Sequence, residues 1–145
     1  MRALLFGLFM LVVAACDPLW VISGGALSGE PTAPPADWTE VAREKTVQVE
    51  TRPADPYSIN IWGVGVGADF YIAAASETNR WVVYLAEDPN VRLRIGKALY
   101  DLRAVRVTDA AELARVQRAY ETKYDVGDEN NRPQETFVYR LDRRL

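Results

Sequence analysis

The sequence predicts an α+β fold, mainly β, in which about six strands form an antiparallel sheet or barrel with two or three helices outside it. Segments of alternating apolar and polar residues recur between residues 46 and 141. Short turns join most of these segments, and such connections favour antiparallel pairing. The clearest apolar stripe at helical spacing lies between residues 109 and 124.

The first elements are expected between residues 37 and 75. Asp37 and Glu40 resemble a capping box, which predicts a short helix over residues 38–44. Strands are predicted at residues 46–52, 58–66 and 69–75, and residues 67–69 between the last two read as a hairpin turn.

The second half continues with alternating strands and helices. Residues 76–79 offer N-caps for a short helix that carries Trp81, Tyr84 and Leu85 on one side, and Asp88-Pro89 ends it. Strands are predicted at residues 91–95 and 98–107. Thr108 or Asp109 then caps a helix that runs to about residue 124, followed by a polar loop at 125–133 and a last strand at 136–141. The helix stripe consists of Leu113, Val116, Tyr120 and Tyr124.

The composition excludes several classes of site. The chain has no histidine and only one cysteine, so a histidine general base, a Ser-His-Asp triad and a Cys/His zinc site are excluded. The net charge of −3 and the scattered arginines argue against a nucleic-acid partner. The mature length suits one domain with one core.

The N-terminus predicts a lipoprotein signal peptide over residues 1–15. Arg2 and the apolar run that follows describe a secretory signal. The ending Val13-Ala14-Ala15-Cys16 resembles a bacterial lipobox, which implies cleavage before Cys16, a diacylglyceryl thioether on its sulfur and an acylated new N-terminus. The alternatives are an ordinary signal peptide with a cysteine nearby, or an uncleaved anchor helix. Asp17 resembles an inner-membrane retention signal, so we expect a lipid-anchored protein on the periplasmic side of the envelope.

Residues 16–36 are predicted to be the lipidated cysteine and a flexible tether, because glycine, proline, serine and alanine dominate there. Within this stretch Trp20-Val21-Ile22 is apolar, and it could rest at the lipid interface or on the domain surface. The folded domain is expected over residues 37–145.

Three features could contact a ligand. Gly63, Gly65 and Gly67 would leave one strand face bare, either for a flat ligand or for close packing at a barrel corner. Arg80-Trp81 could hold a phosphate or an isoalloxazine-like ring, or be a core tryptophan beside a solvated arginine. The third feature is a basic strand face and turn that could bind an anion or simply be solvated, and it comprises Arg92, Arg94 and Lys97.

Taken in order, several short motifs resemble the pyridoxamine 5′-phosphate oxidase-like group, and within it the deazaflavin-dependent nitroreductase-like branch. They are Ile61-Trp62-Gly63-Val64, Phe70-Tyr71-Ile72, Arg80-Trp81 with Tyr84-Leu85, residues 88–96, residues 100–107, residues 109–124 and Val138-Tyr139-Arg140-Leu141. The resemblance implies a six-stranded antiparallel split β-barrel with two or three flanking helices. It also implies a groove for FMN or a deazaflavin, commonly at a homodimer interface. The cofactor-binding candidates carried over by position are Trp62, Arg80, Trp81, Arg94 and Lys97.

These observations favour a membrane-anchored envelope lipoprotein whose domain binds a small molecule or a protein partner without established catalysis. The alternative is a flavin- or deazaflavin-dependent oxidoreductase, in which the cofactor performs the redox chemistry. A third hypothesis is a purely structural, dimeric envelope domain. No catalytic residue and no metal ligand is predicted.

Overall fold

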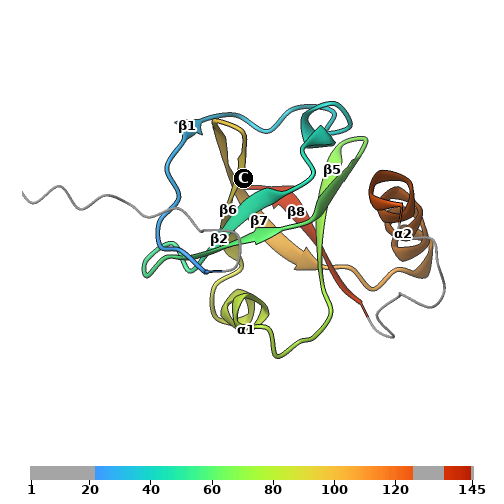
Figure 1. Cartoon of the computed structure of the whole chain (residues 1–145). Helices are drawn as coiled ribbons and strands as arrows, with labels where there is room; N and C mark the ends of the chain where they lie inside the picture. Colours follow the sequence, from blue (N-terminus) through green and yellow to red (C-terminus); the bar gives the residue numbers. More distant parts are fainter. Residues whose placement is uncertain (1–21, 126–135, 145) are drawn as a thin grey trace, which may run out of the picture.

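The computed structural model describes residues 22–125 and 136–144 and shows one sheet curled around an apolar core (Figure 1). The strand order is β3-β2-β6-β7-β8-β5-β4, with every pair antiparallel, and β1 adds in parallel to the start of β7. The α+β, mainly β fold class is therefore confirmed. The strands are β1 (Glu30–Pro31), β2 (Val47–Thr51), β3 (Tyr57–Ile61), β4 (Gly63–Val66), β5 (Asp69–Ala74), β6 (Asn90–Ile95), β7 (Ala98–Arg106) and β8 (Phe137–Arg143).

Three helical elements flank the sheet: the 3₁₀ helix η1 (Val41–Arg43) and the α-helices α1 (Arg80–Glu87) and α2 (Ala110–Tyr124). The two α-helices lie on different sides of the sheet (Figure 1). The buried residues of α1, including Trp81 and Leu85, join the main core, whereas α2 covers a second apolar cluster that includes Val64 and Tyr71.

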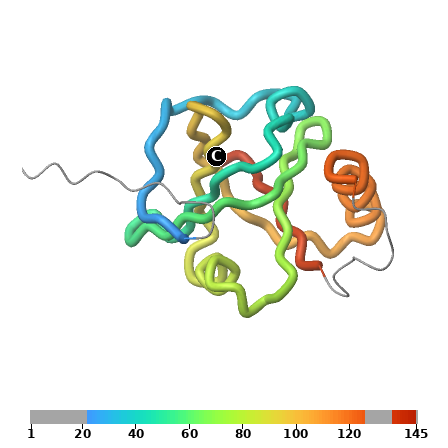
Figure 2. The backbone as a smooth tube through the Cα atoms, viewed as in Figure 1, coloured from blue at the N-terminus to red at the C-terminus, as the bar shows by residue number. Residues whose placement is uncertain are grey.

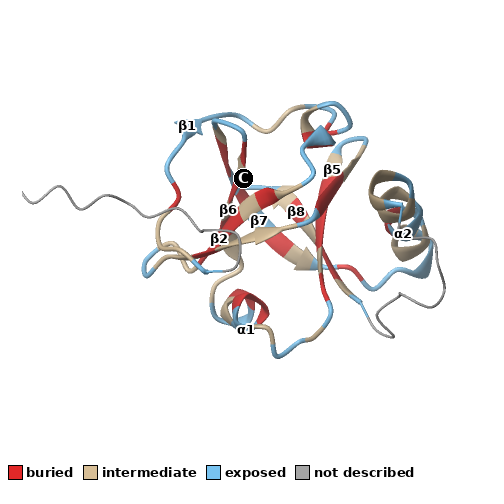
Figure 3. Cartoon of the chain, viewed as in Figure 1, coloured by how far each residue is buried: buried red, intermediate tan, exposed pale blue. Residues whose placement is uncertain are grey.

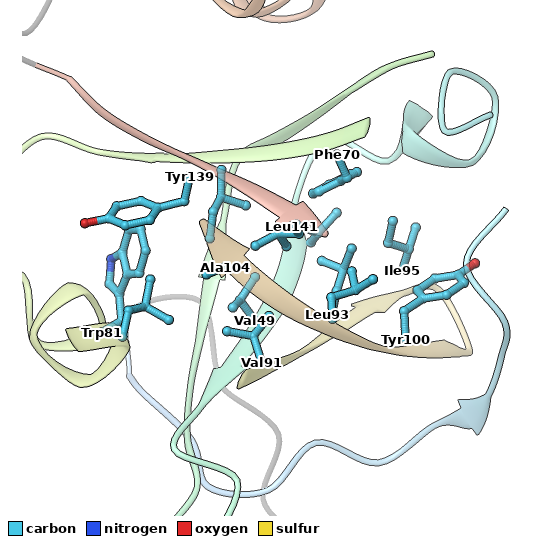
Figure 4. Packing of buried hydrophobic residues seen from close by; sticks show 14 of the residues in the cluster. Val49, Phe70, Trp81, Val91, Leu93, Ile95, Tyr100, Ala104, Tyr139 and Leu141 are labelled. Atoms are coloured by element: carbon cyan, nitrogen blue, oxygen red, sulfur yellow. The ribbon is translucent and has the colours of Figure 1, made fainter. Parts of the chain in front are cut away.

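Alternating side chains of the strands fill the main core, because every second residue of a strand points to the same face. The core strands appear as buried segments in Figure 3. Figure 4 shows Trp81 packed against Tyr139 at one end of the core, where their ring centroids lie 5.7 Å apart. Elsewhere in the core Trp38 lies between Phe70 and Tyr100, at centroid distances of 5.2 and 5.0 Å.

The predicted long helix is confirmed as α2, and its cap is Asp109, whose carboxylate accepts a hydrogen bond from the backbone N–H of Glu112 at 2.8 Å. Asp125 ends the helix in the left-handed conformation, with φ of 53°. The Glu112 side chain turns toward the sheet, where it contacts the Tyr71 hydroxyl at 2.9 Å and Arg140 at 2.7 Å. These contacts fasten α2 to β5 and β8.

The prediction of one strand over residues 58–66 is wrong, because the chain changes partners at Trp62. Before Trp62, β3 pairs with β2; after it, β4 pairs with β5. The two edges of the sheet are therefore consecutive pieces of chain. This break, together with β1, gives eight strands instead of the six predicted. Gly67 lies in the β4–β5 turn with φ of +57°, a conformation that suits glycine, and does not share the strand face of Gly63 and Gly65.

The predicted helix over residues 38–44 is reduced to η1, and the capping box does not form. The Asp37 carboxylate accepts from the backbone N–H of Thr39 at 2.8 Å. The backbone N–H of Trp38 donates to Gly67 O at 2.7 Å, and the Trp38 side chain is 1% exposed. Burial of this indole therefore determines the local conformation and outweighs the helix propensity of the segment.

The prediction of a flexible tether over residues 16–36 is wrong for the part that the structure describes, because residues 22–32 are paired with the sheet. We name residues 22–32 the N-terminal strap, because they run along the outside of the sheet (Figure 2). Gly24 forms an antiparallel bridge with Ser58, β1 pairs with β7, and Leu27 is only 3% exposed. Backbone hydrogen bonding to the sheet holds this glycine-rich stretch in place.

The predicted signal peptide, Cys16 and nearly all of the predicted loop at 125–133 lie outside the described residues. Within residues 22–125 and 136–144, no helix is long and apolar enough to cross a membrane.

Candidate functional site

The sheet opens where β3 turns into β4. Because β4 pairs with β5 only from Gly63 onward, the edge of β5 beyond Ile72 has no β4 partner. The opening leaves a hollow of about 330 Å³, which we call the split wedge. The described residues that line it are Thr46, Asn60, Ile61, Trp62 and Ala73, and none of these is charged.

Trp62 stands at the apex of the split wedge and is 46% exposed. One face of its indole stacks on the Tyr124 ring, with centroids 4.4 Å apart and planes only 7° from parallel. Tyr120 extends this arrangement at 5.7 Å from Tyr124. The exposed part of the indole offers a rigid aromatic surface of the kind that stacks well with a flat ring.

The last turn of α2 fixes the backbone at this apex. Tyr120, Lys123 and Tyr124 occupy positions i, i+3 and i+4, so their side chains leave the same side of the helix. The Tyr120 hydroxyl donates to Trp62 O at 3.1 Å, and the Tyr124 hydroxyl accepts from the N–H of Gly63 at 3.0 Å. These bonds replace ladder hydrogen bonds that the break between β3 and β4 removes.

Lys123 completes the arrangement. Its ammonium group donates to three backbone carbonyls, those of Ala42, Glu44 and Gly63, at 2.6, 2.7 and 2.7 Å. Desolvation lowers the pKa of Lys123, and the nearby charge of Glu44 opposes this effect. Since all three ammonium protons are directed at backbone oxygens, the geometry gives Lys123 a structural role.

Burial also raises the pKa of the two tyrosine hydroxyls, Tyr120 and Tyr124. Both hydroxyls therefore remain protonated and serve as hydrogen-bond donors at neutral pH. The interactions that this apex offers a ligand are stacking on the indole of Trp62 and hydrogen bonding.

The bare glycine face is filled by protein atoms. A Cβ at Gly63 would lie 2.5 Å from the Phe70 ring, and a Cβ at Gly65 would lie 2.6 Å from Trp38 O. The structure therefore supports close packing at a barrel corner, and the flat-ligand alternative for this face does not apply.

The five carried-over residues do not form one groove. Trp62 lines the split wedge, and Arg94 shares the same outer face, because Gln48 lies opposite both Asn60 and Arg94. Two strand spacings, or about 10 Å, separate Asn60 from Arg94. The Arg94 guanidinium donates to Ser28 O in the strap at 3.1 Å. Lys97 is exposed in the turn after β6.

The other two candidates lie near α1. Arg80 is exposed at the start of this helix, with its guanidinium carbon 5.8 Å from the centroid of the Tyr57 ring. Trp81 is 5% exposed and packs on Tyr139, so it is the core tryptophan of the alternative interpretation and cannot line a groove.

Within the basic strand face and turn, Arg92 is held in an ion pair. Arg92 lies directly opposite Glu50 in the β2–β6 pairing and binds its carboxylate through Nε at 2.8 Å and Nη2 at 2.5 Å. Glu50 is fully buried and also accepts from the backbone N–H of Leu27 at 2.6 Å. This ion pair joins two strands and the strap.

Sequence reasoning missed Tyr120, Lys123 and Tyr124 as part of the site, because their spacing is equally that of a core stripe. It also missed Glu50, which sits in an alternating strand as if it faced solvent. Across the described residues there is no cluster of three or more acidic, histidine or cysteine side chains that could hold a metal ion.

Comparison with known proteins supports the fold. The model of a family described as "Uncharacterized protein conserved in bacteria (DUF2255)" matches residues 37–137. No curated protein sequence matches the chain.

Several solved structures are similar in fold. A heme storage protein from Vibrio cholerae has a TM-score of 0.57 at 19% identity, covering 73% of this chain and 87% of that one. An FAD-binding protein from Mesorhizobium loti has a TM-score of 0.56 at 12% identity, covering 72% and 83%. A candidate pyridoxamine 5′-phosphate oxidase from Listeria innocua has a TM-score of 0.54 at 12% identity, covering 70% and 85%. These likenesses show that the fold is the split barrel expected from the sequence motifs.

Proposed function

The chain belongs to the DUF2255 family, and we propose that it is a non-catalytic binding protein whose split wedge takes a planar conjugated small molecule. The observation that carries this proposal is Trp62, which is held rigidly on Tyr124 and is still 46% exposed beside a hollow. FAD and heme, the ligands in the names of two similar structures, both contain planar conjugated rings, which supports this class of ligand.

The wedge fits a ring better than it fits a complete flavin nucleotide. Thr46 and Asn60 supply polar groups beside the indole, and the hollow of about 330 Å³ accepts a small ring system. Among the residues that the structure describes, no cation lines the hollow, and the Arg94 guanidinium is already bonded to Ser28 O. The phosphate of FMN therefore has no partner among the lining residues, so we propose recognition of the ring alone.

Ligand titration tests the proposal. Riboflavin, which has the ring without the phosphate, and FMN are titrated into the purified mature chain while flavin fluorescence is measured. Because stacking on an aromatic side chain is worth about 1–3 kcal/mol, we expect Trp62→Ala to weaken riboflavin binding about tenfold or more. Val83→Ala is the matched control, because Val83 is similarly exposed, at 45%, but lies on α1.

The proposal fails if neither flavin binds at high micromolar concentration, or if Trp62→Ala and Val83→Ala bind riboflavin equally well. A flavin or deazaflavin that co-purifies at one per chain and is turned over by a reductant would instead support the alternative, a flavin-dependent oxidoreductase. Native mass spectrometry of the same preparation reports the bound cofactor and any homodimer together.

We further propose that acyl chains on Cys16 hold the protein on the periplasmic side of the envelope, at the inner membrane in view of Asp17. The lipobox-like Val13-Ala14-Ala15-Cys16 supports this location, and Cys16 is the chain's only cysteine. Labelled palmitate should enter the wild-type protein, and Cys16→Ser should move it out of the membrane fraction. Unchanged fractionation of the variant would refute the anchor.

A further inference from the structure

We infer that the N-terminal strap makes the lipid anchor a short link and lays one end of the domain on the bilayer surface. This end, which we call the anchor face, comprises Ile22, the β2–β3 loop at residues 52–56, Tyr57 and the outer side of α1. The inference rests on the proposed acylation of Cys16 and adds to it the orientation of the domain and a surface that touches lipid.

The strap is fastened along its length. Gly24 and Ser58 exchange two backbone hydrogen bonds at 2.8 and 2.9 Å, and the Ser58 hydroxyl donates to Gly25 O at 2.7 Å. The backbone N–H of Leu27 is held by the buried Glu50 carboxylate at 2.6 Å. At the far end, the backbone N–H of Thr32 donates to Leu99 O at 2.9 Å.

This fastening shortens the reach of the anchor. Only residues 17–21 separate Cys16 from Ile22, so an extended chain spans at most about 20 Å between them. A free tether as far as residue 36 would span about 70 Å. The docked strap therefore keeps the domain within a short distance of the bilayer, with the end that carries Ile22 nearest to it.

The anchor face has the side chains of a membrane interface. Ile22 and Val83 are 61% and 45% exposed, and with Trp62 they are the exposed large apolar residues of the described chain. The Tyr57 and Tyr84 rings pack edge to face at 5.3 Å. Aliphatic and tyrosine side chains of this kind favour the headgroup level of a bilayer, where one end stays wet.

Arginines flank the tyrosines of the anchor face. The guanidinium carbon of Arg52 lies 3.8 Å from the centroid of the Tyr84 ring, and that of Arg80 lies 5.8 Å from the Tyr57 centroid. The bridge between Gly24 and Ser58 places the start of the strap next to Tyr57. In Figure 2 the beginning of the strap lies beside the β2–β3 loop, as this pairing requires.

The charges of this face are nearly balanced. Arg52 is paired with Asp55 at 2.9 Å, and Glu87 lies in the same helix as Arg80. The contact therefore depends on insertion of apolar and aromatic side chains, and anionic lipid is not required. We expect docking onto phosphatidylcholine and little effect of added salt.

Docking by this face leaves the split wedge accessible. Tyr57 begins β3 and Trp62 follows its other end, so about 16 Å of extended strand separates the two residues. The ligand site thus lies one strand length away from the bilayer contact.

Depth-dependent quenching tests the inference on the full lipidated chain in phosphatidylcholine vesicles. Because acylation occupies the only native cysteine, a single introduced cysteine gives a unique labelling site. Val83→Cys reports the anchor face, and Ala68→Cys, exposed in the β4–β5 turn, is the matched control. Each carries an environment-sensitive dye, and brominated lipid is the quencher.

We expect strong quenching and a blue shift at position 83, little change at position 68, and the same pattern at high salt. Equal, weak quenching at both positions with palmitate incorporated overturns the docking while leaving the anchor intact. Loss of the position 83 signal at high salt overturns insertion as its cause. Absence of palmitate overturns the proposed anchor, and with it this inference.

Discussion

Replacing Glu50 with alanine should destabilise the protein more than any ordinary surface change. The substitution leaves the Leu27 N–H buried without an acceptor, which costs about 1–3 kcal/mol. It also leaves the Arg92 guanidinium unpaired, and because that side chain is 27% exposed, water offsets part of the 3–5 kcal/mol typical of a broken buried pair. We expect a loss of about 3 kcal/mol in the free energy of unfolding and a Tm lower by about 10 °C.

Urea and thermal unfolding of four variants test this reasoning. Glu50→Gln keeps an acceptor for Leu27 and should cost roughly half as much. The double change Glu50→Leu with Arg92→Leu should avoid the cost of the unpaired guanidinium, since apolar pairs often replace buried ion pairs without loss. It should keep the loss of about 1–3 kcal/mol from the Leu27 N–H, which still has no acceptor. The matched control is Glu77→Ala, because Glu77 forms an exposed ion pair with Arg106 at 3.0 Å. Equal losses for Glu50→Ala and Glu77→Ala would refute the role of the buried carboxylate.

Three further predictions follow from the packing and the tyrosines. Gly65→Ala should lower the free energy of unfolding in urea by about 3 kcal/mol, because its Cβ would lie 2.6 Å from Trp38 O. A Cβ at Gly25 has nothing within 4 Å, so Gly25→Ala should stay within about 0.5 kcal/mol of wild type. Lys123→Met removes the ammonium donor from three carbonyls, of which Gly63 O also accepts from the Tyr124 hydroxyl at 2.9 Å, and it should cost about 2 kcal/mol. The exposed Lys97→Met should cost almost nothing, and equal melting of the two variants would contradict the carbonyl contacts. Burial raises the pKa of several tyrosines in the folded state. The stability that these tyrosines contribute is therefore complete below about pH 10 and is lost as the pH rises through their folded-state pKa values. The lowered pKa of Lys123 has the opposite effect on stability as the pH rises. The tyrosines concerned are Tyr71, Tyr100, Tyr120 and Tyr124. In an alkaline titration, tyrosinate absorbance should therefore rise together with loss of the sheet circular dichroism signal. Full ionisation of these tyrosines in a still-folded protein would count against their burial.

Local patterns predicted most of the elements. The alternation along β6 and β7 and the stripe of α2 each depend on neighbours within one element, so they are visible in sequence. The end of β3 at Trp62 is not visible, since Ile61 and Val64 are as compatible with a continuing strand as with a change of partner. The chain changes partner because β3 pairs with β2 and β4 pairs with β5. These two pairs lie at opposite ends of the strand order, so a local pattern does not reveal the change.

The candidate site could be predicted only in part for the same reason. Trp62 became a groove candidate through a family resemblance, whereas the contacts by which Lys123 supports the backbone beside it join residues 60 to 81 positions apart. Glu50 and Arg92 are 42 positions apart and meet through a pairing of strands that are not consecutive. An alternating pattern assigns Glu50 to the outer face correctly, but it does not reveal that the strap covers that face.

Glycine misled the sequence analysis because one residue type serves opposite purposes in this chain. In the strap, glycine suggested flexibility, yet a Cβ at Gly29 would lie 2.9 Å from Lys97 O, so its absence lets the strap approach β7 closely. At Gly65 the same close approach brings the backbone of Trp38 against the sheet. Composition alone does not show that either glycine segment is closely packed. What distinguishes the strap from a true linker is Leu27, a large apolar residue between Gly25 and Gly29, which becomes buried once the backbone can come near. A glycine-rich stretch that contains such a residue and adjoins a predicted sheet is therefore better treated as a packing segment than as a tether.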